Sequence, residues 1–192
     1  PSDGMFNFAA VCQQGGVEES DRLAQLAATL QPSDNINIQF TSGTTGMPKG
    51  ATLSHTNILN NAYHAGNTMH MTADDILCIP VPMYHCFGMV LGTLLCVAQG
   101  ATMVLPCEVF DPGPVLQAVQ DEKCTALHGV PTMFIAELDL PSFDEFDVST
   151  LRTGIIAGSP YPIELMKRLI SDMELTEIVI GYGQTECSPL NS

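Results

Sequence analysis

Residues 41–50 read T-S-G-T-T-G-M-P-K-G and lie between two short runs that suit extended backbone. The run Ile36–Phe40 alternates apolar and polar side chains, and Ala51-Thr52-Leu53 follows the loop directly. Alternation with a period of two is typical of β-strands, and glycine with proline between two such runs is typical of a turn. We therefore predict that the loop joins two strands as a hairpin.

The same loop has the composition of an anion-binding site. Lys49 is the only lysine or arginine between Arg22 and Lys123, and it lies in a run with four hydroxyl residues and three glycines. Glycine lets backbone N–H groups approach an oxyanion, while hydroxyls and lysine add donors and charge. The loop is not a Walker A motif, and a flexible turn with a solvated lysine is the alternative interpretation. The candidate phosphate-binding residues are Thr41, Ser42, Gly43, Thr44, Thr45, Gly46, Met47, Pro48 and Lys49.

Outside this loop, β-rich runs alternate with segments of helical periodicity, which predicts an α/β fold with a largely parallel sheet flanked by helices. Ser54 is a candidate N-cap, and Pro162 suits the first position of a helix. We expect a helical lead-in over residues 1–35 and the main domain over residues 36–192. The predicted strands are Ile36–Phe40, Ile76–Val81, Ala101–Leu105, Thr125–Val130, Gly154–Ala157 and Glu177–Ile180; the helices are Glu19–Leu30, Cys86–Ala98 and segments after Ser54, Pro112 and Pro162.

A second loop, G-Y-G-Q-T-E at Gly181–Glu186, follows an apolar run. Tyr182 between glycines can lay its ring against a planar base, and Thr185 can bond a phosphate oxygen. Glu186 can hold Mg²⁺, which favours carboxylate together with water and phosphate. A β-turn with an exposed glutamate is the alternative interpretation. The candidate residues here are Gly181, Tyr182, Gly183, Thr185 and Glu186.

Two weaker loops also follow predicted strands. A-G-S-P at 157–160 offers close backbone approach at Gly158 and Ser159, although this loop taken alone favours a plain strand-to-helix turn. M-Y-H-C-F-G at 83–88 places His85 at a strand end, where a core histidine is the alternative. The remaining histidines suggest no metal site and are interpreted as structural: His55, His64, His70 and His128.

The four loops share a position that favours a binding site. In open α/β sheets, ligands bind at the carboxyl ends of the strands. If each loop follows a strand of one sheet, anion donors, a carboxylate, an aromatic ring and a histidine meet in one crevice. Such a crevice suits a nucleoside triphosphate with a metal ion and a second substrate.

Composition excludes several functions. The net charge is −15 with six Lys and Arg, and these are not clustered. Binding to nucleic acid or to an anionic membrane surface needs clustered basic residues, so both partners are excluded. Seven cysteines without C-x-x-C spacing indicate reduced intracellular thiols. No signal peptide or transmembrane run is visible. The charged fraction is 14%, below the roughly 25% usual for soluble domains. We therefore expect that the chain is a piece of a longer protein.

The motifs resemble those of the adenylate-forming superfamily, which contains acyl-CoA synthetases, luciferases and peptide-synthetase adenylation domains. Thr41–Gly50 looks like its phosphate-binding signature, and Gly181–Glu186 looks like its Y-G-x-T-E motif. The sequence around these motifs, including M-Y-H-C-F-G and I-I-A-G-S-P, is most similar to the acyl-CoA synthetase family member 2 group of medium-chain fatty acyl-CoA ligases. The resemblance covers nearly all of the chain and is weakest before residue 30.

This resemblance implies an ATP-dependent ligase that acts on a fatty acid. A carboxylate attacks the α-phosphate of Mg-ATP, and the thiol of coenzyme A then takes the acyl group. By the resemblance, the loop Thr41–Lys49 wraps the β- and γ-phosphates, and Tyr182 stacks on adenine near Gly158 and Ser159. The catalytic residues implied are Lys49, Thr185, Glu186 and His85, with Glu186 as the Mg²⁺ ligand.

The resemblance also implies parts that this chain lacks. They are the ribose-binding aspartate, the hinge, the C-terminal lid domain with its lysine, and the start of the N-terminal domain. We therefore expect the chain alone to be inactive or nearly so, and expect a mitochondrial location by resemblance. Three alternatives stay open: a truncated, non-catalytic nucleotide-binding remnant, adenylation for an acceptor other than coenzyme A, and a plain α/β domain.

Overall fold

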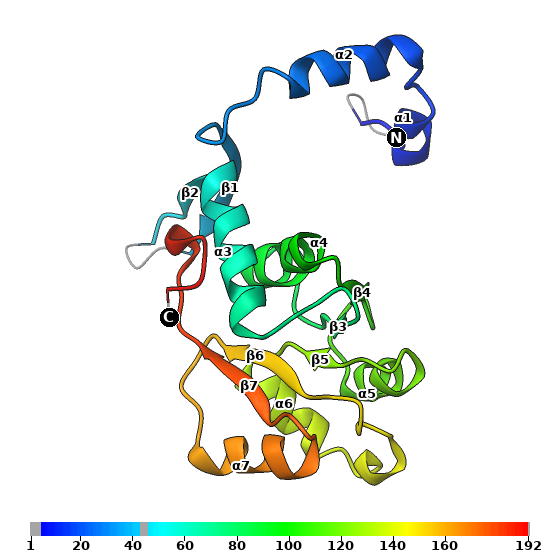
Figure 1. The fold of residues 1–192 in the computed structure, drawn as a ribbon, viewed down its shortest axis with the longest axis vertical. Coiled ribbons are helices and arrows are strands. Elements are labelled where there is room, and N and C mark those ends of the chain that lie inside the picture. Colours follow the sequence, from blue (N-terminus) through cyan, green and yellow to red (C-terminus); the bar gives the residue numbers. More distant parts are fainter. Residues whose placement is uncertain (1–4, 43–45, 192) are drawn as a thin grey trace. The chain divides into compact units, whose positions relative to one another are not determined.

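The computed structural model describes residues 5–42 and 46–191 and divides into two compact units, Pro1–Asp34 and Asn35–Ser192 (Figure 1). The first unit holds α1 (Phe8–Cys12) and α2 (Val17–Ala27). The predicted helix over 19–30 is present, but it begins and ends earlier. The early start has a local cause, because the Glu19 carboxylate accepts a hydrogen bond from the Gly16 N–H at 2.9 Å and so caps the first turn.

The second unit contains a five-stranded sheet in the order β4-β3-β5-β6-β7, and every neighbouring pair is parallel. This confirms the predicted largely parallel sheet. β3 is shorter than predicted because Pro80 and Pro82 follow it and cannot donate to a ladder. Beyond β5, pairing continues as a single bridge between Gly129 and Ile156. The strands are β3 (Ile76–Cys78), β4 (Thr102–Val104), β5 (Ala126–Leu127), β6 (Thr153–Ala157) and β7 (Glu177–Gly181).

Helices cover both faces of this sheet (Figure 1). Successive strand residues point to opposite faces, so Leu77 and Ile155 belong to one hydrophobic cluster while Cys78 and Ile156 belong to the other. The first cluster is closed by α3 (His55–Thr68), η1 (Phe87–Leu94) and α4 (Leu95–Gln99). The second is closed by α5 (Pro112–Asp121), α6 (Pro131–Leu138) and α7 (Ile163–Asp172), with the 3₁₀ turn η2 (Phe143–Glu145) alongside.

The predicted helix signals are confirmed with two refinements. Ser54 caps α3, since its side chain accepts from the Asn57 N–H. The predicted helix Cys86–Ala98 is a π-helical segment, η1, that continues into α4, and π-helical turns are frequent at functional sites. Pro162 stands one residue earlier than predicted, as the N-cap of α7.

The predicted hairpin is confirmed as β1 (Asn35–Thr41) paired antiparallel with β2 (Lys49–Ser54). It forms a separate two-stranded sheet. The prediction that all four loops follow strands of one sheet is therefore wrong for the loop at 41–50. The physical reason is that the chain turns back after this loop, so β1 forms its hydrogen bonds with β2 and not with a strand of the larger sheet.

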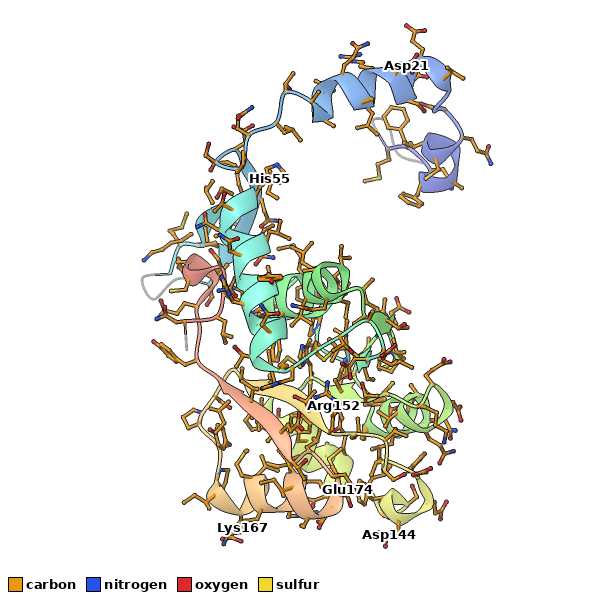
Figure 2. The ribbon with its side chains drawn as sticks, viewed as in Figure 1. Asp21, His55, Asp144, Arg152, Lys167 and Glu174 are labelled. Carbon is orange, nitrogen blue, oxygen red and sulfur yellow. The ribbon has the colours of Figure 1, made fainter. Side chains whose placement is uncertain are left out.

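The amino ends of the strands are held by an ionic network around Arg152, labelled in Figure 2. Its guanidinium lies 2.8 Å from the buried Asp75 carboxylate and 2.7 Å from the Glu177 carboxylate. It also donates to the carbonyl oxygens of Met69 and His70. The network connects the end of α3 to the amino ends of β6 and β7. A binding site is therefore expected at the carboxyl ends of these strands. Within the described residues, no helix has the length and apolar character needed to cross a membrane.

Candidate functional site

A cavity of about 220 Å³ opens where β6 and β7 end. Three of the four predicted loops contribute to it, which is the convergence that strand polarity favours. The wall is apolar on the side of η1, and the loop after β7 adds both polar side chains, Gln184 and Thr185, and apolar ones, Pro189 and Leu190. The lining residues are His85, Cys86, Phe87, Leu91, Ala157, Gly158, Gly183, Gln184, Thr185, Pro189 and Leu190.

The loop after β6 brings its backbone to the cavity. Ala157 ends the strand, and Gly158 then takes a φ of +96°, a left-handed value that suits glycine. A β-carbon at Gly158 would also lie 3.2 Å from the Val130 side chain. Gly158 lines the cavity as predicted, whereas Ser159 is exposed beside it.

The turn Tyr182–Asn191 follows β7 and contains the 3₁₀ turn η3 (Thr185–Cys187). Its two ends pair with each other, since Gln184 N–H donates to the Pro189 carbonyl and Asn191 N–H to the Tyr182 carbonyl, both at 2.9 Å. Gly183 is needed here because a β-carbon would collide with the Pro189 carbonyl oxygen. Thr185 lines the cavity, while Tyr182 and Glu186 are exposed.

His85 lies at the rim of the cavity and is exposed, so it is not the core histidine of the alternative interpretation. Its Nδ1 accepts the Phe87 N–H at 3.1 Å. The neutral ring then carries its hydrogen on Nε2, which can donate to a bound oxygen. The buried histidine is His128, whose Nε2 lies 2.9 Å from the Leu91 carbonyl oxygen; burial lowers its pKa to about 4.

Cys86 connects two of the loops and was missed in the sequence. Its Sγ lies 3.6 Å from Thr185 Oγ1 and 3.7 Å from His85 Nδ1. Burial raises the pKa of this thiol, so Cys86 stays protonated and acts as a weak hydrogen-bonding bridge. Gln184, Pro189 and Leu190 were missed as well, because nothing in their spacing distinguishes them from an ordinary turn.

The loop at 41–50, predicted to bind phosphate, contributes differently from the other three. Thr41 and Lys49 face each other at the loop end of the hairpin, and Ser42 and Gly46–Lys49 are exposed. None of the described loop residues lines the cavity. However, β2 packs against η3, the turn that contains Thr185 and Glu186 (Figure 1). The predicted residues Gly43, Thr44 and Thr45 lie outside the described residues.

The charges near the site suit an anion with a metal ion. Neither Lys49 nor Glu186 forms an ion pair in the part of the chain that the structure describes. In that part, no group of three or more His, Cys, Asp or Glu side chains is arranged to hold a metal. A single carboxylate fits Mg²⁺ that keeps water and phosphate oxygens as its other ligands. The arrangement can thus hold a polyphosphate beside an apolar pocket with a hydrogen-bond donor at its rim.

Curated relatives share most of this chain. It is 52% identical to acyl-CoA ligase sidI of Aspergillus fumigatus, over 97% of this chain and 32% of that protein. It is 46% identical to the mitochondrial medium-chain acyl-CoA ligase ACSF2 of Danio rerio, over 97% of this chain and 31% of that protein. The chain therefore spans about a third of the length of these relatives.

A solved structure has the same fold. ATP-bound MatB of Rhodopseudomonas palustris is 26% identical and superposes with a TM-score of 0.72, over 87% of this chain and 34% of that chain. The AMP-binding enzyme family matches residues 4–192. The match includes both sequence motifs and the whole cavity, and it confirms the predicted resemblance. The chain belongs to the AMP-binding enzyme family.

Proposed function

We propose that the complete product of this gene activates a fatty acid with ATP and transfers it to coenzyme A. In the first step, the carboxylate oxygen bonds to the α-phosphorus and pyrophosphate leaves, which gives acyl-adenylate. In the second, the thiol of coenzyme A bonds to the acyl carbon and AMP leaves. The observation that carries the proposal is the cavity in which His85, Gly158 and Thr185 meet, in a chain with acyl-CoA ligase relatives.

The proposed roles follow from charge and position. Lys49 and the other residues of the loop Thr41–Lys49 bind the β- and γ-phosphates. The packing of β2, which begins at Lys49, against η3, which begins at Thr185, supports this role. Thr185 bonds the α-phosphate. Glu186 holds Mg²⁺, whose charge would neutralise the phosphate oxygens when it is bound. Most of the catalysis is then positioning and charge stabilisation.

Nucleoside and acyl group lie on opposite sides of the α-phosphate. Tyr182 is exposed beside Gly181 and Gly183 and presents its ring to the adenine, with Gly158 and Ser159 next to it. His85 donates from Nε2 to the carboxylate of the fatty acid at the rim of the apolar wall. That wall contains Phe87 and Leu91, which suit a hydrocarbon chain.

The finer assignments are part of the same proposal. A medium-chain acid and a mitochondrial location are supported by the name of the ACSF2 relative. ATP as the nucleotide is supported by the ATP-bound MatB neighbour. Residues 36–192 would form the central part of the AMP-binding domain and residues 1–35 a helical lead-in, which the division after Asp34 supports.

The test is pyrophosphate release with ATP, Mg²⁺ and straight-chain fatty acids from two to sixteen carbons. The assay uses the 192-residue chain and the complete gene product. We expect release from the complete product, with a maximum at medium chain lengths, and acyl-CoA when coenzyme A is added. Binding of ATP without release from either protein would refute the ligase and leave a nucleotide-binding protein.

A further inference from the structure

Asn61 on α3 forms a side-chain contact with the turn that follows β7. Its Nδ2 donates to the Leu190 carbonyl oxygen at 2.7 Å, and its Oδ1 accepts the Leu190 N–H at 3.0 Å. The amide thus pairs with both polar groups of one backbone residue, as a neighbouring strand would. The two residues are 129 positions apart in the sequence, so the contact is set by the tertiary fold.

The position of Asn61 follows from the amphipathic pattern of α3. Ile58 and Ala62 point into the hydrophobic cluster, and Asn61 lies at the border of that buried face. Leu190 packs against the same cluster from the other side. A β-carbon on Gly181 would lie 2.9 Å from the Leu190 side chain, so Leu190 covers the end of β7 closely. Asn61 is therefore half-buried on α3. Figure 1 shows α3 beside the turn that follows β7.

Packing holds the turn in part, because β2 contacts η3 and Leu190 packs against the first hydrophobic cluster. Its backbone bonds, between Gln184 and Pro189 and between Asn191 and Tyr182, join the turn to itself. They set its shape but do not bond it to the rest of the protein. The side chains outside the turn that bond to it include Asn61 and Cys86, and the Cys86 contact is a weak sulfur contact of 3.6 Å.

We propose that Asn61 is a positioning residue, which holds the turn Tyr182–Asn191 so that Thr185 and Glu186 face the nucleotide phosphates. The expected effect of Asn61 on catalysis rests on the proposed function. Asn61 does not itself touch the substrate. It acts through Leu190, which anchors the far end of the turn. A displacement of ~1 Å in a reacting group can lower a rate by up to about a hundredfold, so this anchor is expected to matter for turnover.

The test compares Asn61→Leu with Gln99→Leu in the complete gene product. Leucine at 61 keeps the size of the side chain and removes both hydrogen bonds. Gln99 is a matched control because its half-buried amide also donates two bonds to α3, to the Tyr63 carbonyl and to the Asn67 side chain, yet it does not contact the turn. Asn60→Leu, on the exposed side of α3, controls for helix propensity.

Three quantities are measured for each variant: the melting temperature, kcat and KM for pyrophosphate release, and the affinity for Mg-ATP by calorimetry. For Asn61→Leu we expect kcat to fall at least about tenfold, with the KM for the fatty acid within about twofold. For Gln99→Leu and Asn60→Leu we expect kcat within about twofold of the parent, even where the melting temperature falls. Amide hydrogen exchange over residues 183–190 should accelerate in Asn61→Leu alone.

Equal losses of kcat in Asn61→Leu and Gln99→Leu would overturn the inference, because both would then act through stability. An unchanged kcat in Asn61→Leu would overturn it as well. If the parent protein releases no pyrophosphate, the proposed function fails, and the affinity for Mg-ATP decides the role of Asn61. Weaker binding in Asn61→Leu than in Gln99→Leu then supports positioning, and equal binding refutes it.

Discussion

Replacing Glu137 is expected to change both the stability of this protein and the way that stability depends on pH. Glu137 lies on the inner face of α6, three residues after the buried Phe134, and it is itself fully buried. Neither carboxylate oxygen has a hydrogen-bond partner among the described residues. Burial without a partner raises the pKa of this carboxyl well above its usual value of 4.5, so the folded protein holds it neutral.

The sign of the pH effect follows from the raised pKa. Below about pH 4.5 the carboxyl is protonated in both the folded and the unfolded chain. Its pH-dependent contribution to the free energy of unfolding is then fully present. As the pH rises above that value, the unfolded chain loses the proton while the folded chain keeps it. The free energy of unfolding then falls by about 1.4 kcal/mol per pH unit, until the pH reaches the folded pKa.

Two variants separate the pH effect from the burial cost. Glu137→Gln keeps the shape of the side chain and cannot ionise. The part of the pH dependence of the free energy of unfolding that comes from this residue should therefore disappear. Glu137→Met is also unbranched and removes the unpartnered polar atoms. It should raise the free energy of unfolding by about 1–3 kcal/mol, the usual cost of a buried polar group without a partner.

The assay is urea unfolding of the complete gene product at pH 5, 6 and 7, with the slope against urea checked for constancy. Glu122→Gln, at an exposed position after α5, is the control and should match the parent at each pH. The reasoning is refuted if Glu137→Gln shows the same pH slope as the parent, or if Glu137→Met is less stable. Either result would mean that a buried water satisfies the carboxylate in solution.

Three further predictions concern charge and backbone. Glu186→Gln should lower kcat for pyrophosphate release by roughly 10²–10³ and weaken its dependence on Mg²⁺ concentration, and an unchanged Mg²⁺ titration would argue against a metal ligand. Asp75→Asn should cost about 3 kcal/mol in urea unfolding, the low end for a broken buried pair because Arg152 is partly exposed; a loss below 1 kcal/mol would contradict the network. Gly183→Ala should displace the Pro189 carbonyl and lower kcat by about tenfold or more, while binding of the fatty acid stays measurable.

Local pattern was sufficient to predict the elements. The alternation of β-rich and helical segments predicted the parallel sheet, and the cap at Ser54 predicted the start of α3. The type of each element and its cap depend on neighbours within a few residues, so the sequence contains their cause. Strand ends were less accurate. β3 stops at Cys78, because Pro80 and Pro82 follow it and cannot donate to a ladder.

The site was predictable only in part. Gly158, Thr185 and His85 were identified because each stands in a recognisable loop after a strand, and all three line the cavity. Their roles toward a nucleotide remain predictions. Cys86 and Leu190 carry no local signal, since a cysteine beside a histidine and a leucine after a proline are ordinary in any core.

The sequence by itself determined the family, the fold class and the chemistry available at the loops, because motifs, periodicity and charge are all properties of short segments. Only the tertiary structure decided which segments meet. It showed that the hairpin around loop 41–50 forms a sheet separate from the five-stranded one, and that Asn61 bonds to Leu190. It also left Glu137 buried with no hydrogen-bond partner among the described residues. The reason is physical: burial and long-range contact depend on how the layers close over the sheet, and residues far apart in sequence set that closure together.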